Sequence, residues 1–463
     1  MTALDIKDLS VFTGAHRLLG PVSFSLGEGD VFVVMGETGA GKSLIAQAIL
    51  GTLPASLRME GEIAINGRRV DRLPPAERAL LWGREIATLP QEPWLALSPL
   101  MASWRQVAET HVHVGGRTQR DAKQATANDF VALGLEAAEP RLPGQLSGGM
   151  AQRVAFAAAT AGRAPILLAD EPTKGLDSDR RDKVVSLLRD VPDTGGTLLT
   201  ITHEAFAARA LGGRIMVLRH GNVVEQGQTL DVLTDPQADY TKKLLAADPS
   251  QWPDTPRSNP GRAILTAQDV ALSRGDRVLV RGFNLTLHEG ERVAITGPSG
   301  IGKSTLLDAL AGLIKPVEGT IKRAAHLDRY SVQKLYQDPP AAFPRHVTLG
   351  RSLRDVADLH DRSWDEVMDT YGELGLAPDL LARTPDSVSG GELQRISIVR
   401  ALTVRPKVLL ADEPTSRLDP ITQKDTLDLI SRISLREGIS VVLVTHDRAM
   451  VEAWADRVVD LSS

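Results

Sequence analysis

The feature that most constrains this chain is a glycine-rich octapeptide that occurs twice. Gly36–Ser43 and Gly297–Ser304 both match the pattern G-x-x-x-x-G-K-[ST] at every defined position. Each copy follows an apolar run typical of a buried strand and precedes a segment with the apolar spacing of a helix. A strand, a glycine-rich loop and a helix in this order form a phosphate-binding turn, so the chain is predicted to contain two of them.

The chemistry of this loop requires its residue types. Glycines let successive backbone N–H groups point at one anion, and the following helix N-terminus adds partial positive charge. The lysine is predicted to reach the β- and γ-phosphates, and the serine to ligate Mg²⁺. The predicted nucleotide-binding residues of the loops are Gly36, Gly39, Gly41, Lys42, Ser43 and Leu44 in the first copy, and Gly297, Gly300, Gly302, Lys303, Ser304 and Thr305 in the second.

Composition narrows the function classes. A chain of 463 residues, 42% hydrophobic and 24% charged, is long enough for two large domains with their own cores. The net charge of −5 and the 4% aromatic content argue against nucleic acid as a partner. The absence of cysteine excludes disulfides, thiolate metal sites and cysteine nucleophiles. No apolar run approaches the roughly 18 residues of a membrane span, and the N-terminus does not resemble a signal peptide, so we expect a cytoplasmic protein.

The repeat extends beyond the loops. Each half contains two further continuous apolar runs, which are typical of strands buried in a parallel sheet. In each half the first run ends in two acidic residues and the second ends in a histidine. The repeated pairs are Ser147-Gly148-Gly149 with Ser389-Gly390-Gly391, Asp170-Glu171 with Asp412-Glu413, and His203 with His446.

With these motifs in this order, together with a glutamine before each SGG triplet, the chain resembles two fused ABC ATPase domains. The resemblance implies an α/β fold of two P-loop ABC ATPase domains, each with a RecA-like mixed sheet core, an antiparallel β subdomain and a helical subdomain. It implies domains at residues 1–246 and 263–463. A proline-rich, stiff linker is predicted at residues 247–262.

The resemblance also implies a Mg²⁺-dependent ATPase with a catalytic set in each half. In this family a glutamine touches Mg²⁺ and the attacking water, a glutamate orients or deprotonates that water, and a histidine bonds to the γ-phosphate. The implied catalytic residues are Gln91, Glu171 and His203 in the first half, and Gln337, Glu413 and His446 in the second. The implied metal ligands are Ser43, Gln91 and Asp170, and Ser304, Gln337 and Asp412.

The family's ATP sites are composite, because the signature of one domain contacts the γ-phosphate bound by the other. We therefore expect the two halves to pair within the chain, with Ser389, Gly390 and Gly391 completing the first site and Ser147, Gly148 and Gly149 the second. Phe12 is the expected adenine-stacking residue of the first half. The aligned position of the second half holds Ser273 beside Arg274, which leaves its adenine partner open, and Lys174 stands where the family commonly has serine.

Three further segments resemble the ATPase pair of dipeptide, oligopeptide and nickel importers. They are residues 91–99, the signature at 146–150, and the tail Tyr240-Thr241-Lys242-Lys243-Leu244-Leu245. This resemblance implies an energy-coupling subunit at the cytoplasmic face of the inner membrane, which drives uptake of peptide, nickel, a metallophore or a similar small solute. The implied partners are two integral-membrane permeases and, indirectly, an extracytoplasmic solute-binding protein, with no nucleic acid.

The residues after each glutamine are candidates to line grooves that receive the permeases. These are Trp94, Leu95 and Leu97 in the first half and Ala341 and Phe343 in the second; the alternative is that they pack the helical subdomains. A second function stays open at this point: an ABC ATPase subunit of a soluble assembly, either a carbon–phosphorus bond-cleaving complex or a ribosome-associated factor.

Overall fold

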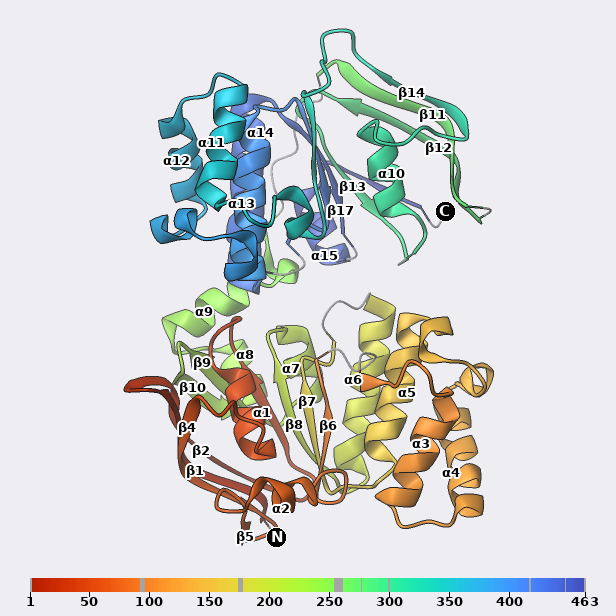
Figure 1. Ribbon diagram of the computed structural model, residues 1–463, viewed down its shortest axis with the longest axis vertical. Helices are drawn as coiled ribbons and strands as arrows, with labels where there is room; N and C mark the ends of the chain where they lie inside the picture. Colours follow the sequence, from red (N-terminus) through yellow and green to blue (C-terminus); the bar gives the residue numbers. More distant parts are fainter. Residues whose placement is uncertain are drawn as a thin grey trace. The chain divides into compact units, whose positions relative to one another are not determined.

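A computed structural model describes residues 2–91, 96–173, 178–253, 261–275, 277–298, 300–415, 418–445 and 447–461. The chain divides into two units, Met1–Leu245 and Ala246–Ser463 (Figure 1). Each unit has its own sheets and its own apolar cores, so each is described by itself.

The first unit is built on a six-stranded sheet in the order β10-β9-β3-β8-β7-β6. Its strands run parallel except for the antiparallel pair of β9 and β10. The central strands β3, β7 and β8 are buried along almost their whole length, as expected of a parallel sheet that is covered on both faces. The strands are β3 (Val31–Met35), β6 (Ile86–Leu89), β7 (Ile166–Asp170), β8 (Thr197–Thr202), β9 (Arg214–Arg219) and β10 (Asn222–Gln228).

An antiparallel sheet in the order β2-β1-β4-β5 faces this central sheet across helix α1 (Lys42–Leu50). Ile45 and Ile49 of α1 share one apolar core with Ile6 of β1 and Val34 of β3, which fixes the helix between the two sheets (Figure 1). The strands are β1 (Thr2–Thr13), β2 (His16–Gly27), β4 (Leu57–Ile65) and β5 (Arg68–Arg69).

The remaining helices of the first unit form a helical subdomain and flank the sheet. Helices α3, α4 and α5 gather on the side away from the antiparallel sheet, around Val107, Phe130 and Val154 (Figure 1). The helices are α2 (Pro75–Ala79), α3 (Ser103–His113), α4 (Gln119–Ala132), α5 (Gly148–Thr160), α6 (Ser178–Asp193), α7 (Ala205–Leu211), α8 (Thr229–Thr234) and α9 (Asp239–Ala246), with short 3-10 turns η2 (Glu136–Ala138) and η3 (Pro143–Gln145).

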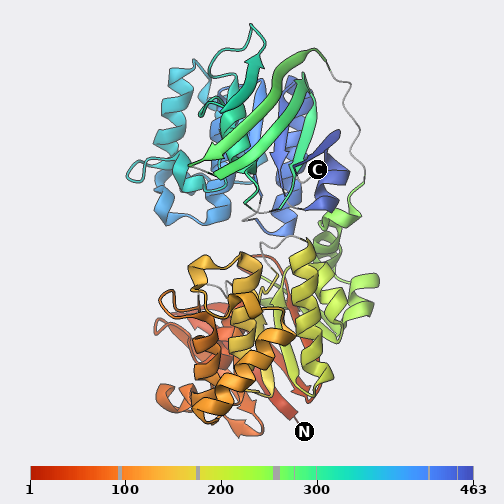
Figure 2. The ribbon, with the colours of Figure 1, turned by 90° about the vertical axis from the view of Figure 1, so that its right-hand side faces the viewer.

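The second unit repeats this plan with a parallel sheet in the order β15-β16-β17-β13-β18 and an antiparallel sheet in the order β12-β11-β14. Figure 2 shows β11 and β12, in green, lying in front of the central elements of this unit. The strands are β11 (Ala263–Arg274), β12 (Arg277–His288), β13 (Arg292–Thr296), β14 (Glu318–Arg323), β15 (Val332–Leu335), β16 (Val408–Asp412), β17 (Ser440–Val444) and β18 (Arg457–Asp460). The helices are α10 (Lys303–Leu310), α11 (Leu349–Leu359), α12 (Trp364–Glu373), α13 (Gly390–Thr403), α14 (Pro420–Glu437) and α15 (Arg448–Trp454), with 3-10 turns η4 (Pro249–Gln251), η5 (Pro339–Ala342), η6 (Pro378–Ala382) and η7 (Pro385–Ser387).

The two units correspond at the level of strand register. Leu89 pairs with Ala169 in the first central sheet, and Leu335 pairs with Ala411 in the second. The predicted α/β fold, with a core sheet, an antiparallel subdomain and a helical subdomain in each half, is confirmed. Positions in one unit therefore identify their counterparts in the other.

The first residues of the predicted linker pack on the second unit. The indole N–H of Trp252 donates to the carbonyl of Ala247 at 3.0 Å, and the ring contacts the apolar core of that unit. The ammonium of Lys424 in α14 lies 5.6 Å from the centroid of the same ring. Within the described residues, no helix is both long enough and apolar enough to cross a membrane.

Candidate functional site

The first glycine-rich loop connects β3 to α1. Gly39 has φ 82° and Gly41 has φ 96°, left-handed conformations that favour glycine, and Gly41 is the N-cap of α1. The ammonium of Lys42 donates to the carbonyl oxygens of Gly36 at 2.7 Å and Glu37 at 2.9 Å. The loop is thus curled around the buried ammonium of Lys42. In the first turn of the helix, Ser43 is exposed and Leu44 is half-buried.

The second loop, between β13 and α10, has the same conformation. Gly300 has φ 82° and Gly302 has φ 113°, and the ammonium of Lys303 donates to the carbonyls of Gly297 at 2.7 Å and Pro298 at 3.0 Å. Ser304 is exposed and Thr305 half-buried at the start of α10, whereas Ser299 lies outside the described residues. Both loops thus place a serine hydroxyl and a helix N-terminus beside a lysine.

The two predicted glutamates share an unusual backbone conformation. Glu171 follows β7 and Glu413 follows β16, and each has φ 46°, which is left-handed. A non-glycine residue in this region costs on the order of 1 kcal/mol or more and persists only where its surroundings hold it. Here the neighbouring strand does so, because the N–H of Glu171 donates to Ile201 at 2.8 Å and that of Glu413 to Val444 at 3.0 Å.

The first unit brings four predicted residues together. The amide of Gln91 donates to Oε2 of Glu171 at 3.2 Å, and Nζ of Lys42 lies 3.7 Å from Oε1 of the same carboxylate. Nδ1 of His203 lies 3.3 Å from Oε1 of Glu171, in an orientation that does not form a hydrogen bond. The carboxylate is therefore buried among a cation, an amide and an imidazole at the carboxyl edge of the sheet, beside Asp170 at the end of β7.

In the second unit, the corresponding residues that the structure describes also lie together. The amide of Gln337 donates to Oε2 of Glu413 at 3.0 Å, and Ser304, at the start of α10, lies beside Asp412 at the end of β16. Burial raises the pKa of Asp412, although the neighbouring hydroxyl of Ser304 and the charge of Lys334 oppose this shift. His446, Lys174, Trp94 and Leu95 lie outside the described residues.

A hydroxyl beside a carboxylate at the end of the phosphate-binding loop offers the oxygen donors that Mg²⁺ prefers. The Ser304–Asp412 pair therefore fits a magnesium ion. When bound, the ion would neutralise phosphate charge next to these two residues.

The signature residues begin helices in both units. Ser147 caps α5, where its hydroxyl accepts from the N–H of Met150 at 3.4 Å, and Gly148 and Gly149 form the first turn. Ser389 caps α13 in a capping box, with Glu392 donating its N–H at 3.3 Å to the hydroxyl and accepting the serine N–H at 2.8 Å. Gly390 and Gly391 open that helix, so both signatures present the N–H groups of a helix N-terminus.

The predicted adenine position differs between the units. Phe12 is half-buried on β1, and the guanidinium of Arg58 lies 4.7 Å from the centroid of its ring. Phe12 pairs with Arg17 across the hairpin as Ser273 pairs with Val278, so Ser273 is its structural counterpart. Arg274, next to Ser273, is exposed.

Two residues that the sequence analysis placed in permease grooves are buried instead. Leu97 and Phe343 are each 6% exposed and belong to the apolar cores of the helical subdomains. The prediction that they line open grooves is wrong, because an apolar side chain after the glutamine serves packing equally well. Ala341 is exposed, as is Leu100, which is 89% exposed in the turn before α3.

Sequence reasoning missed two contacts at the loops. The N–H of Glu37 donates to the hydroxyl of Tyr240 in α9 at 3.1 Å, and the guanidinium of Arg219 lies 4.9 Å from the Tyr240 ring centroid. Lys334, on β15, lies 3.6 Å from the carboxylate of Asp412. The available signal for Lys334 was a charged residue between the apolar residues Val332 and Leu335; for Tyr240 there was no local signal.

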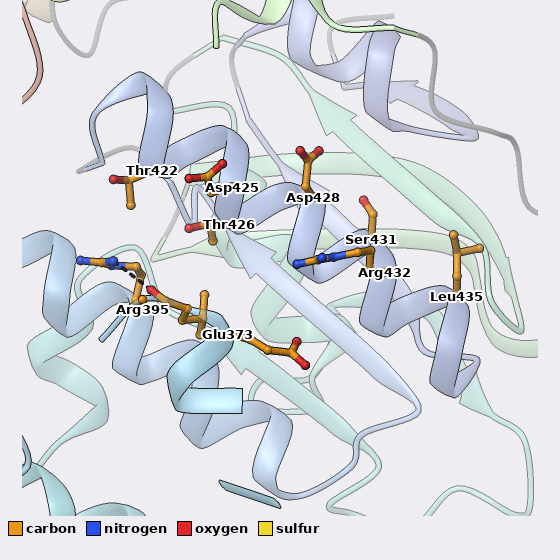
Figure 3. A pocket seen from close by; sticks show the side chains of 11 residues that line it. Glu373, Arg395, Thr422, Asp425, Thr426, Asp428, Ser431, Arg432 and Leu435 are labelled. Carbon is orange, nitrogen blue, oxygen red and sulfur yellow. Dashed lines mark hydrogen bonds between the residues drawn. The ribbon is translucent and has the colours of Figure 1, made fainter. Parts of the chain in front are cut away.

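A separate cavity of about 580 Å³ lies in the second unit, between the end of α12 and helix α14 (Figure 3). It is lined by acids and bases together, with Asp425, Asp428 and Glu373 near Arg395 and Arg432 (Figure 3). In the described part of the chain, none of the predicted nucleotide-binding positions lines it. Its mixed charge does not single out an anion such as phosphate.

Two strand–loop–helix turns, each with a buried lysine in the loop and a glutamine–glutamate pair at the adjacent strand ends, define a P-loop nucleoside-triphosphatase. The family model for the ABC transporter matches residues 19–174 and 280–416. The chain belongs to this family: it is an ATPase with two ABC domains, and it uses ATP with Mg²⁺.

Several relatives are similar over nearly the whole chain. The peptidoglycan transport ATP-binding protein YejF of Agrobacterium fabrum is 33% identical, over 98% of this chain and 90% of the relative. The glutathione import ATP-binding protein GsiA of Salmonella typhi is 30% identical, over 94% of this chain and 80% of the relative. Among solved structures, the RNase-L Inhibitor has a TM-score of 0.67 at 21% identity, over 97% of this chain and 87% of that one, a likeness of fold alone.

Proposed function

We propose that this chain is the ATP-hydrolysing subunit of an ABC importer, bound to integral-membrane permeases at the cytoplasmic face of the inner membrane. The observation that carries the proposal is the similarity, over 98% of this chain, to a relative named for peptidoglycan transport. A second relative, named for glutathione import, supports uptake as the direction of transport.

The cargo we propose is a small solute that contains a peptide. Glutathione is a tripeptide, and peptidoglycan carries short peptides, so the names of both relatives favour this class over nickel or a metallophore. Selection of the cargo belongs to an extracytoplasmic solute-binding protein and to the permeases, since the proposed role of this chain is to supply energy.

In each ATP site we propose the same division of labour. The loop lysine binds the phosphates, the serine and the strand-end aspartate hold Mg²⁺, and the glutamate acts as general base on the attacking water while the glutamine orients that water. In the first half the contact from Gln91 to Glu171 supports this arrangement, and in the second the contact from Gln337 to Glu413. The histidines, His203 and His446, are proposed partners of the γ-phosphate.

We propose that both sites are composite within one chain. Lys42, Ser43, Asp170, Glu171 and His203 would be completed by Ser389, Gly390 and Gly391. Lys303, Ser304, Asp412, Glu413 and His446 would be completed by Ser147, Gly148 and Gly149. The N–H groups in the first turns of α5 and α13, where both signatures lie, support an anion-binding role for them.

The two halves differ where a permease is expected to dock. Leu100 and His346 occupy equivalent exposed turns before α3 and α11, and one is apolar while the other is not. Catalysis does not require this difference, whereas two non-identical permeases would account for it. We therefore propose one permease subunit for each half.

Cross-linking to the permeases tests this proposal. Because the chain has no cysteine, Leu100→Cys and His346→Cys each introduce a single thiol. In membranes that hold the complete transporter, position 100 is expected to capture one permease and position 346 the other. Leu97→Cys, whose thiol would be buried, is the matched control and should capture neither. Equal capture of both permeases at each position, or no capture, would contradict the proposal.

A soluble assembly remains the second candidate, and no observation favours it. The structural likeness to the RNase-L Inhibitor stands at 21% identity and therefore concerns the fold alone. Purification of the chain with its native partners separates the two candidates, because the importer is expected to bring membrane proteins with it.

A further inference from the structure

A buried lysine stands beside the strand-end aspartate of the second ATP site. The side chain of Lys334, on β15, is 6% exposed, and its ammonium lies 3.6 Å from Oδ2 of Asp412. It also donates to Oδ1 of Asp308 in α10 at 2.7 Å. The ring of Tyr336, with its centroid 5.2 Å away, contributes a cation–π contact. The ammonium is therefore held between two carboxylates and an aromatic ring.

The first unit lacks this charged pair at the corresponding positions. Thr88 pairs with Leu168 in the first sheet as Lys334 pairs with Leu410 in the second, so Thr88 is the counterpart of Lys334. Gln47 follows the start of α1 at the same spacing as Asp308 follows the start of α10. A neutral threonine–glutamine combination in one half thus stands where the other half has lysine and aspartate.

Lysine and aspartate occur together in the second unit and are both absent from the equivalent positions of the first, so the buried charge comes with its compensating carboxylate. A buried ammonium is costly unless carboxylates compensate it, and Asp308 supplies the closer of the two contacts. Asp308 therefore holds the ammonium of Lys334 in place, and the same ammonium also lies close to the carboxylate of Asp412. A cation this close reduces the negative potential that an aspartate offers to a second cation.

We propose that Lys334 makes the two ATP sites unequal, by weakening the hold of Asp412 on Mg²⁺ in the second site. Lys334 is a positioning residue, because it acts through Asp412 rather than on the nucleotide. The inference rests on the proposed role of Asp412 as a magnesium ligand. It implies that Mg²⁺ contributes less to ATP binding in the second site than in the first.

The test measures how much Mg²⁺ strengthens nucleotide binding at each site. The readout is the ratio of dissociation constants for the non-hydrolysable analogue AMP-PNP with EDTA and with saturating Mg²⁺, from equilibrium dialysis of the full chain. Lys42→Ala removes binding at the first site, so that the second is measured alone, and Lys303→Ala isolates the first site. The isolated second site is expected to give the smaller ratio.

The decisive variant gives the second site the residues of the first. Lys334→Thr with Asp308→Gln removes the pair without leaving an unpaired buried charge, and should raise the second-site ratio about tenfold, the scale of a nearby charge on a carboxylate equilibrium. The reciprocal variant, Thr88→Lys with Gln47→Asp, should lower the first-site ratio by a similar factor. It also keeps the proposal testable if the first variant does not fold.

Two controls complete the design. Lys322→Thr removes a lysine exposed on β14 and should leave the ratio unchanged. Asp412→Asn should abolish most of the Mg²⁺ effect at the second site. If Asp412→Asn changes nothing, Asp412 is not a magnesium ligand and the inference falls with that assignment. A second outcome is that Asp412→Asn reduces the Mg²⁺ effect while Lys334→Thr with Asp308→Gln raises the second-site ratio less than twofold or lowers it. That result would overturn the proposed role of Lys334 and leave Asp412 as a magnesium ligand.

Discussion

At the scale of single residues, the two glutamates that follow the strand-end aspartates hold an uncommon backbone conformation. Glu171 and Glu413 share the same left-handed backbone angle, φ 46°, and each accepts a hydrogen bond from a glutamine side chain. Strain of this kind is retained where the surrounding structure holds it, and here it aims two carboxylates at equivalent places in the two units.

We expect Glu171→Gln and Glu413→Gln each to reduce steady-state ATP hydrolysis, because each substitution removes a proposed general base. Removal of such a base typically costs about 100-fold or more at the affected site, so the double variant should be nearly inactive. Phosphate release measures the effect, and Glu136→Gln on the exposed turn η2 is the control. Full activity in either single variant would mean that its site does not hydrolyse ATP.

Glu291 supports a prediction about stability. Burial by itself raises the pKa of Glu291, but hydrogen bonds from Arg457 and from the backbone N–H of His288 outweigh it and hold this pKa below its ordinary value. A depressed folded-state pKa stabilises the fold above the unfolded-state pKa, and this contribution disappears as the pH falls through the folded-state value.

Glu291→Gln should therefore lower the free energy of unfolding at pH 7 by about 2 kcal/mol, the scale of a charge-assisted buried hydrogen bond. The deficit relative to the parent chain should shrink as the pH falls below about 4, where the glutamate of the unfolded chain is protonated. Urea unfolding across this range measures it. A deficit that stays constant down to the lowest pH would show that the charge of Glu291 is not the cause.

At the scale of elements, helix α9 contacts the first phosphate-binding loop although it lies far along the chain. The hydroxyl of Tyr240 accepts the N–H of Glu37, and the ring is packed against Arg219. This contact fixes a backbone group within the loop, so the tail of the first domain helps to set the shape of the first ATP site.

We expect Tyr240→Phe to weaken AMP-PNP binding at the first site about fivefold, since a typical hydrogen bond contributes about 1 kcal/mol. The measurement uses the Lys303→Ala background to isolate that site. Tyr371→Phe, which loses a 2.9 Å bond to the carbonyl of Ala377 in the helical subdomain, is the matched control for loss of a tyrosine hydroxyl. An unchanged dissociation constant in Tyr240→Phe would rule out a role for α9 in nucleotide binding.

At the scale of the whole molecule, two complete ABC domains in one chain have a consequence for assembly. A linker long enough for the two halves to meet raises the effective concentration of one half near the other to about the millimolar range. Composite sites are then expected to form within one chain rather than between two.

With both Glu171→Gln and Glu413→Gln in place, addition of ATP should produce a compacted monomer. Light scattering measures the mass, and small-angle scattering measures the decrease in radius of gyration. The parent chain without nucleotide is the control. A dimer of chains at low concentration, in place of a compact monomer, would count against pairing of the halves within one chain.

The sequence by itself determined the elements whose causes are local. The strand before the first glycine-rich loop was predicted from its apolar run, and β3 (Val31–Met35) lies there, because a strand, its glycine-rich loop and the next helix are contiguous in the chain. The strand-end acids were predicted for the same reason, since a continuous apolar run that stops at two carboxylates marks a buried strand and its end. Repetition of both patterns in the second half identified the fold of both units.

Only the tertiary structure decided what depends on segments distant in sequence. Lys334, Asp308 and Asp412 come from β15, α10 and β16, and no local pattern states that their side chains meet. Tyr240 reaches a loop 203 residues earlier in the chain. Leu97 and Phe343 show the same limit, because an apolar residue after a turn suits a core and a docking surface equally well. Which of the two it joins is decided by the helices that pack over it, and that packing is a property of the folded unit.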